Sequence, residues 1–215
     1  MIFETRCAGC DRPGSTAICT TCRFALVGRP PASGPEGVVA VLPFTGRVRS
    51  VVLGMKYRNR RAVGRHLAGL VVNRVVELGL ADGVDVVTWA PTSARRRRER
   101  GFDQGELIAR TVARQLGLPC RRLLERTDRR GGPQTGRSRV ERLGGPSFVA
   151  RPGIDGLRAL VVDDVVTTGA TLRGARDALA ERGADAVAVA VAATPDRSMA
   201  AVVPLRRRSS AATAA

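Results

Sequence analysis

The segment with the clearest chemical pattern is Ala159 to Thr171, ALVVDDVVTTGAT. Four apolar residues precede two adjacent carboxylates, Asp163 and Asp164, and a turn rich in threonine and glycine follows. A buried parallel strand would deliver the carboxylates to its carboxyl end, where open α/β sheets bind ligands. The turn would open a helix, whose first N–H groups attract anions. Because carboxylates repel an anion unless they face hydroxyls or a divalent cation, this pattern favours a sugar phosphate.

A second candidate site lies near the N-terminus, where four of the five cysteines fall within residues 7–22. They form two Cys-x2-Cys pairs separated by eight residues: Cys7, Cys10, Cys19 and Cys22. Their thiolates can converge tetrahedrally on zinc. So short a segment has almost no core, so the metal would be its main source of stability. Disulfides and an iron–sulfur cluster are the alternatives.

Charge and composition limit the partners of this chain. The 215 residues include 36 lysines and arginines against 19 acidic residues, a net charge of +17, which predicts anionic partners such as phosphorylated metabolites or nucleic acid. Aromatic residues make up only 3%, which weakens any model in which rows of rings stack single-stranded bases. No apolar run approaches the ~20 residues of a membrane span. The N-terminus meets charge and cysteine within its first seven residues, so we expect no secretory signal, no membrane insertion and a cytoplasmic location.

Between these features the sequence alternates short β-branched runs with helical periodicity, the pattern of a parallel sheet flanked by helices. The expected strands are 38–44, 84–90, 123–126, 158–165 and 186–193. Apolar residues at helical spacing predict a helix over 60–78 that Gly79 stops. A second helix begins after Asp103, with Glu106 completing a capping box, and ends at Gly117. A third carries Leu172, Ala175 and Leu179 and is closed by Gly183.

Two loops and two composition changes complete the predicted organisation. Residues 91–102 are expected to form a charged loop, and residues 128–146, rich in glycine, proline and arginine, a long binding loop. The Pro/Gly-rich stretch 29–37 separates the cysteine module from the rest. We therefore predict a zinc module over 1–28, a linker over 29–37, an α/β domain over 38–197 and a disordered tail over 198–215.

The segment from Ala159 to Thr171 resembles the signature of type I phosphoribosyltransferases, which use 5-phosphoribosyl 1-pyrophosphate (PRPP) with Mg²⁺. The resemblance implies that Asp163 and Asp164 contact the ribose hydroxyls and form the centre of the catalytic site. It also implies that the following turn holds the 5′-phosphate. The turn and its flanks comprise Val165, Val166, Thr167, Thr168, Gly169, Ala170 and Thr171.

With its four-cysteine head, nearly the whole chain resembles the ComF family. Further matching elements are LGMKY at 53–57 and RGFDQ at 100–104, in which Asp103 replaces the usual Asn. The resemblance adds Lys56 and Arg100 to the PRPP site. It also makes residues 128–145 a hood loop, whose candidate contacts are Gln134, Arg137, Arg139 and Arg142. Gly144 stands where the family commonly has Asn.

Two functions remain open on the sequence. One is a phosphoribosyltransferase that transfers its group to an unidentified nitrogen nucleophile and releases pyrophosphate. The other is a non-catalytic competence factor that handles single-stranded DNA and works with a protein of the competence machinery. Arg121 and Arg122, or the arginines at 206–208, could then bind DNA outside the PRPP site. A third interpretation attributes the charge to solubility and compositional drift.

Overall fold

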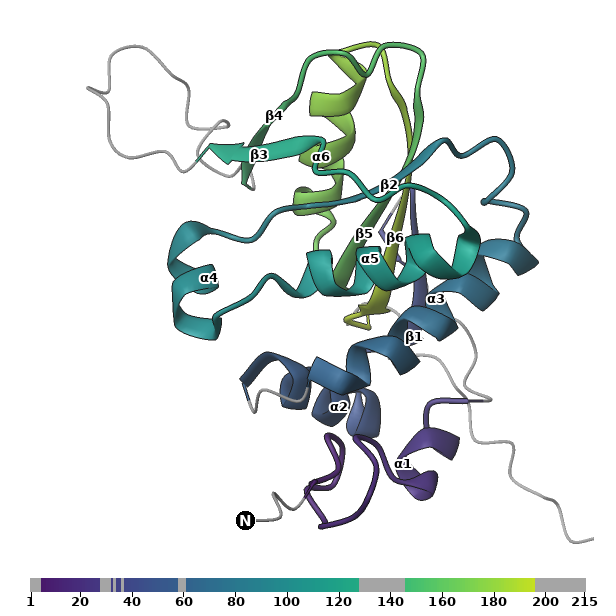
Figure 1. Ribbon diagram of the computed structural model, residues 1–215, viewed down its shortest axis with the longest axis vertical. Helices are drawn as coiled ribbons and strands as arrows, with labels where there is room; N and C mark the ends of the chain where they lie inside the picture. Colours follow the sequence, from purple (N-terminus) through teal and green to yellow (C-terminus); the bar gives the residue numbers. More distant parts are fainter. Residues whose placement is uncertain are drawn as a thin grey trace, which may run out of the picture.

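The computed structural model describes residues 5–27, 32, 34–35, 37–57, 61–127 and 146–195. At its centre is a four-stranded sheet in the order β1-β6-β5-β2, in which every pairing is parallel (Figure 1). These strands are β1 (Val38–Pro43), β2 (Val86–Trp89), β5 (Arg158–Val166) and β6 (Asp185–Ala193). The predicted parallel α/β sheet is therefore confirmed, with strand bounds within two residues of expectation.

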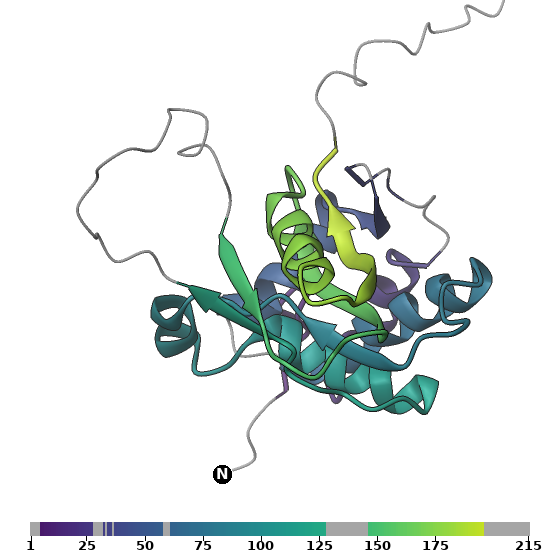
Figure 2. The same ribbon diagram turned by 90° about the horizontal axis from the view of Figure 1, so that it is seen from above.

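Alternate residues of β5 face opposite sides of the sheet, and helices cover both (Figure 2). Leu160 and Val162 join the core shared with α3 (Gly64–Glu77) and α5 (Gln104–Leu116). Ala159 and Val161 belong to the core shared with α6 (Ala170–Ala180). Burial on both faces is the environment for which near-continuous apolar strands are selected.

A two-stranded antiparallel sheet extends the α6 side. It pairs β3 (Leu124–Thr127) with β4 (Ser147–Ala150), with Leu124 opposite Ala150. The prediction of a short strand at 123–126 is confirmed by β3, whereas β4 was not predicted, because its four residues carry too little periodicity to identify. The predicted loop contacts Gln134, Arg137, Arg139 and Arg142 lie outside the described residues, as do the predicted tail and most of the linker.

The predicted helices form with their expected faces. Helix α3 follows a single 3₁₀ turn, η1 (Arg61–Val63), and buries Leu67, Val71 and Val75 completely. Helix α5 is capped by Asp103, whose Oδ1 accepts a hydrogen bond from the Glu106 N–H at 3.3 Å. The Glu106 side chain pairs with Arg110 at 2.7 Å, so the reciprocal half of the expected capping box is replaced by an i,i+4 ion pair.

The prediction of a charged loop over 91–102 is wrong in its central part. Residues Ala94–Arg100 form helix α4, all of it exposed except half-buried Arg100. The caps explain the difference: Ser93 accepts a hydrogen bond from the Arg96 N–H, and Gly101 ends the helix in the left-handed conformation at φ 73°. Arginine is also a good helix former, so charge density alone does not indicate a loop.

The cysteine head packs onto helix α2 (Gly46–Tyr57) and contains one short helix, α1 (Thr20–Phe24) (Figure 1). Its buried residues, Ile18 and Leu26 among them, belong to the same apolar cluster as Val48 and Val51 of α2. The head therefore shares a core with the sheet domain. None of the helices in the described residues is long and apolar enough to cross a membrane.

Candidate functional site

The two signature carboxylates lie on β5 where its neighbour β2 has already ended. The last β2 residue, Trp89, pairs with Val162, so Asp163 and Asp164 project beyond the end of that strand. β5 itself continues to Val166 and pairs with β6 as far as Ala193. At the carboxylates, β5 is therefore paired with β6 along one edge, whereas β2 no longer pairs with it along the other edge.

Lys56 approaches Asp164 from the last turn of α2. Its Nζ lies 2.9 Å from both Asp164 carboxylate oxygens, across 108 residues of sequence. The side chains are only 15% and 12% exposed, so water screens the pair weakly. The structure therefore brings two of the predicted site residues into direct contact, and Lys56 neutralises one of the two adjacent negative charges.

Asp163 has no such partner among the described residues. It is half-buried, and its Oδ1 accepts a hydrogen bond from the Asp164 N–H at 2.7 Å. Loss of hydration, followed by repulsion from Asp164, raises the pKa of Asp163 to about 8. The carboxyl group is therefore held in its neutral form over much of the acid to neutral range.

The turn after β5 consists of Thr167, Thr168 and Gly169, and Ala170 and Thr171 begin α6. Both turn threonines are exposed, and the Thr168 hydroxyl accepts a hydrogen bond from the Ala170 N–H at 3.4 Å. Gly169 caps the helix with φ 78°, a conformation that favours glycine. An exposed turn with hydroxyls at the start of an eleven-residue helix is suited to binding a phosphate.

Arg100 lies at the end of α4 and is fixed by two side chains. Its Nη1 donates to Gln104 Oε1 at 2.8 Å, and its Nη2 donates to the Tyr57 hydroxyl at 3.0 Å. The guanidinium also lies 5.0 Å from the centre of the Tyr57 ring. Tyr57 follows Lys56 directly, so Arg100 is connected to the carboxylates through α2 and makes no contact with them in the described residues.

Asp103 has a role that sequence reasoning found only in part. Beyond capping α5, it accepts a hydrogen bond from the Thr92 N–H at 2.9 Å and thereby holds the segment that follows β2. Burial raises the pKa of Asp103, although the N–H donors of Thr92 and Glu106 oppose that shift. The second contact joins residues 11 apart, and no local pattern indicates it.

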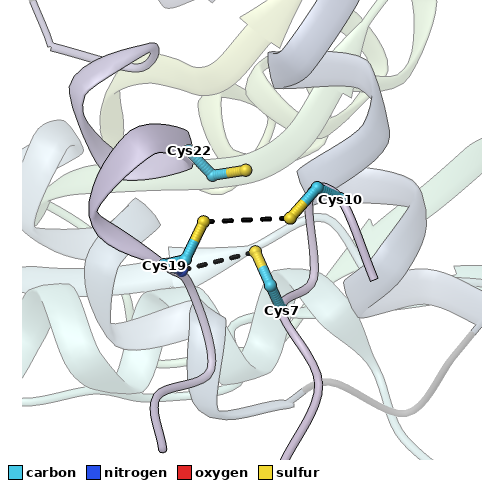
Figure 3. Close-up of side chains that lie close together, drawn as sticks. All are labelled: Cys7, Cys10, Cys19 and Cys22. Atoms are coloured by element: carbon cyan, nitrogen blue, oxygen red, sulfur yellow. Dashed lines mark hydrogen bonds between the residues drawn. The ribbon is translucent and has the colours of Figure 1, made fainter. Parts of the chain in front are cut away.

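In the head, the four cysteine sulfurs converge (Figure 3) and lie within 4.8 Å of one another. The Cys10 and Cys19 sulfurs are 3.8 Å apart, the separation expected for thiolates on a tetrahedral zinc with bonds of about 2.3 Å. All described cysteines are free, which argues against the disulfide alternative in this arrangement. The residues present therefore fit a structural zinc ion.

Backbone groups in the head also favour metal binding. Cys7 Sγ accepts hydrogen bonds from the N–H groups of Cys19 at 3.3 Å and Gly9 at 3.4 Å. Burial opposes ionisation of Cys7, but the N–H donors of Cys19, Cys10 and Gly9 outweigh it and lower the pKa of this thiol to about 6. A preformed thiolate is the form that ligates zinc.

A four-stranded parallel sheet with an acidic pair and a threonine/glycine turn before the next helix is the arrangement of a phosphoribosyltransferase-type fold. A family model described as the phosphoribosyl transferase domain matches residues 103–204. The fold class predicted from the sequence is therefore confirmed.

Two named relatives show which proteins with this fold the chain resembles. DNA utilization protein YhgH of Salmonella typhi is 28% identical over 160 residues, which span 72% of this chain and 70% of that protein. Competence protein ComFC of Bacillus subtilis is 33% identical over 95 residues, which span 43% of this chain and 37% of that protein. This chain is a ComF-like protein with a phosphoribosyltransferase fold.

Among solved structures, the allosteric regulatory enzyme of purine biosynthesis matches with a TM-score of 0.41 and 24% identity. That match covers 61% of this chain and 26% of the enzyme, so the chain spans about a quarter of its length.

Proposed function

We propose that this protein binds PRPP at the end of β5 and transfers its phosphoribosyl group to a nitrogen nucleophile. The observation that carries the proposal is the placement of Asp163 and Asp164 immediately before a threonine-bearing turn that opens α6. In this assignment the carboxylates contact the ribose hydroxyls. The 5′-phosphate is bound by the turn and its flanks, Val165 to Thr171.

Lys56 makes this site suitable for an anionic substrate. Without a cation, Asp164 would repel the phosphates of PRPP, but Lys56 Nζ lies 2.9 Å from both of its oxygens. The neutral form of Asp163 reduces the negative charge further. In this proposal Arg100 binds the pyrophosphate, because its guanidinium can donate to two phosphate oxygens at once. Both cations therefore serve binding and orientation.

The proposed reaction is a displacement at the anomeric carbon of the ribose. The lone pair of the acceptor nitrogen forms the new C–N bond, the C–O bond to pyrophosphate breaks with its electron pair leaving on oxygen, and the proton released from the nitrogen passes to the pyrophosphate or to water. When bound with PRPP, Mg²⁺ neutralises charge on the leaving pyrophosphate. The backbone around Thr92, held by Asp103, is positioned to line the pyrophosphate side. The loop at 128–145 is the proposed cover that excludes water.

The test is calorimetric titration of the zinc-loaded protein with PRPP and Mg²⁺. We expect micromolar binding that falls at least about 100-fold in the double variant Asp163→Asn/Asp164→Asn, because Asp164 loses its charge and each side chain loses a carboxyl oxygen that accepts from a ribose hydroxyl. The matched control is Asp177→Asn, which changes a carboxylate on α6 that is not part of the turn. Absence of binding by the wild-type protein, or equal binding by the double variant, would refute the proposal.

A second function is proposed because two relatives carry the names DNA utilization protein and competence protein. Here the fold is a binding scaffold for single-stranded DNA in the cytoplasm and contacts a protein of the competence machinery. Arg121 and Arg122 are exposed, lie outside the proposed PRPP site and are the candidate contacts to the DNA phosphates. Filter binding with Arg121→Gln/Arg122→Gln would test it: reduced DNA affinity with unchanged PRPP affinity supports a separate DNA surface.

A further inference from the structure

The short turn between α4 and α5 brings two side chains together. Arg100 is the last residue of α4, and Gln104 is the first residue of α5. Between them, Gly101 ends α4 in the left-handed conformation. Gln104 Oε1 accepts a hydrogen bond from Arg100 Nη1 at 2.8 Å. The arginine that we assign to the pyrophosphate is therefore held by the helix that follows it.

Gln104 is itself held firmly at the start of α5. Its side chain is buried, with only 2% of the residue exposed. Asp103 caps α5 and also accepts a hydrogen bond from the Thr92 N–H at 2.9 Å, which ties the helix start to the segment after β2. A Cβ on Gly105 would lie 3.4 Å from Trp89 Cβ, so the first turn of α5 packs against the end of β2. The amide of Gln104 can therefore fix the position of Arg100.

Arg100 determines which way the Gln104 amide is turned. A guanidinium only donates hydrogen bonds, so the amide must present its oxygen to Arg100 Nη1. The amide nitrogen, Nε2, is then buried without a hydrogen-bond acceptor among the described residues. A buried donor without an acceptor costs free energy. Because an apolar side chain of similar size would avoid that cost, packing alone does not account for a glutamine at this position.

Both side chains that hold Arg100 are neutral. The second is Tyr57, whose hydroxyl accepts a hydrogen bond from Arg100 Nη2 at 3.0 Å. No carboxylate of the described residues forms an ion pair with Arg100, and its neighbour Glu99 pairs with Arg95 instead. Other arginines pair with carboxylates at 2.7 to 2.9 Å, as in Arg74–Glu77, Arg110–Glu106 and Arg151–Glu125. Arg100 is therefore fixed in orientation while its positive charge and further N–H donors stay available to an anion.

We propose that Gln104 is a positioning residue, which orients Arg100 for the pyrophosphate without neutralising its charge. A glutamate at this position would form an ion pair with the guanidinium and compete with pyrophosphate for it. The amide supplies the same acceptor atom and carries no charge. The inference rests on the proposed role of Arg100 at the pyrophosphate, and it gives Gln104 a function that acts only through Arg100.

The test titrates the zinc-loaded full chain with pyrophosphate and Mg²⁺ and, separately, with ribose 5-phosphate. Gln104→Met removes the acceptor and should weaken pyrophosphate binding about tenfold. Gln104→Glu keeps an acceptor but neutralises Arg100, and it should also weaken pyrophosphate binding about tenfold. Both variants should bind ribose 5-phosphate as the wild type does, which shows that the site is folded. Gln115→Met, at an exposed position of α5, is the matched control and should not change either affinity.

A double-mutant cycle separates positioning from packing. Arg100→Gln should weaken pyrophosphate binding at least about tenfold. Adding Gln104→Met to Arg100→Gln should cause no further loss, because the effect of Gln104 passes through Arg100. Tyr57→Phe, at an exposed position, removes only the second acceptor and should weaken pyrophosphate binding about threefold. A further tenfold loss on adding Gln104→Met to Arg100→Gln would overturn the inference.

The outcomes separate this inference from the proposed function. If Arg100→Gln weakens pyrophosphate binding but either Gln104 variant binds it as the wild type does, Gln104 is not the positioning residue and the proposed site stands. If Arg100→Gln leaves pyrophosphate binding unchanged, or if the wild-type protein does not bind pyrophosphate with Mg²⁺, the proposed role of Arg100 is wrong and the inference is refuted with it.

Discussion

The cysteine head and the β5–α6 segment are both short motifs. The head contains every proposed ligand of its site, whereas the β5–α6 segment contains only part of the residues of its site. All four sulfurs of the head come from residues 7–22 and lie within 4.8 Å of one another. The β5–α6 segment supplies two carboxylates and a turn, but the cation that balances Asp164 comes from Lys56, 108 residues away. Asp103, which accepts a hydrogen bond from the Thr92 N–H after β2, lies at the start of α5.

This difference shows which sites can be recognised locally. A metal site in a small loop is defined by ligand spacing, because the chain has few ways to bring four thiolates together. A substrate site at a sheet edge is assembled from several elements, because parallel strands place distant segments at the same edge. The head should therefore respond to changes within its own residues, whereas the β5–α6 site should respond to changes on α2 and α5.

The largest expected effect is loss of a head ligand. In Cys7→Ser or Cys22→Ser, stoichiometric zinc should be lost and thermal stability should fall, because these buried side chains, 2% and 1% exposed, would join the two Cys-x2-Cys loops through the metal. Atomic absorption and thermal denaturation would measure both. Cys120→Ser, outside the cluster, should keep the metal; retention of full zinc by Cys7→Ser would contradict the four-thiolate site.

The next effect concerns the Lys56–Asp164 pair. Lys56→Met leaves Asp164 without its cation, and we expect unfolding free energy to fall by up to about 3 kcal/mol, the lower range for an unpaired buried charge. PRPP affinity should also decrease, about tenfold. Urea denaturation and calorimetry would measure the two quantities.

Two variants sharpen this result. Adding Asp164→Asn to Lys56→Met should recover part of the stability, because the unpaired charge is then removed. Arg74→Met breaks the exposed Arg74–Glu77 pair and should cost less than about 1 kcal/mol. If Lys56→Met costs no more than Arg74→Met, the long-range pair does not support the site.

A smaller effect is expected at the contact between head and α2. A Cβ on Gly54 would clash with the Ala8 carbonyl oxygen, so Gly54→Ala should destabilise the protein by about 1–3 kcal/mol despite the better helix propensity of alanine. Gly69→Ala on α3 is the control, since its nearest neighbour would be Gln115 Oε1 at 3.9 Å. That control should gain about 0.5–1 kcal/mol. Equal stability changes in urea would show that the head is not packed on α2.

The last expected effect is a pH dependence of stability that is set by Asp163. Its pKa is raised to about 8 in the folded protein, against about 3.9 in an unfolded chain. Between these values the unfolded state binds fewer protons, so this group lowers stability as pH rises from about 4 to 8. Asp163→Asn should therefore become more stable than the wild type as pH rises. Denaturation at pH 5, 6.5 and 8 measures the trend, and a constant difference across these pH values would contradict it.

The sequence determined the elements whose signals are local. Apolar periodicity predicted α3, and β-branched runs predicted β1, β5 and β6, because burial on a helix face or within a sheet imposes a fixed spacing. Capping residues predicted the start of α5, and ligand spacing predicted the cysteine cluster. The same kind of local signal, Ser93 and Gly101 at the ends of α4, was present but was outweighed by the charge between them.

Only the tertiary structure decided which distant residues complete each site. No sequence pattern predicts the contacts of Lys56 with Asp164, of Asp103 with Thr92 or of Tyr57 with Arg100. These contacts depend on strand order and on how closely α2 can approach the head at Gly9 and Gly54. Close packing of the whole core fixes where these elements lie relative to one another, and a short segment of sequence does not contain that information.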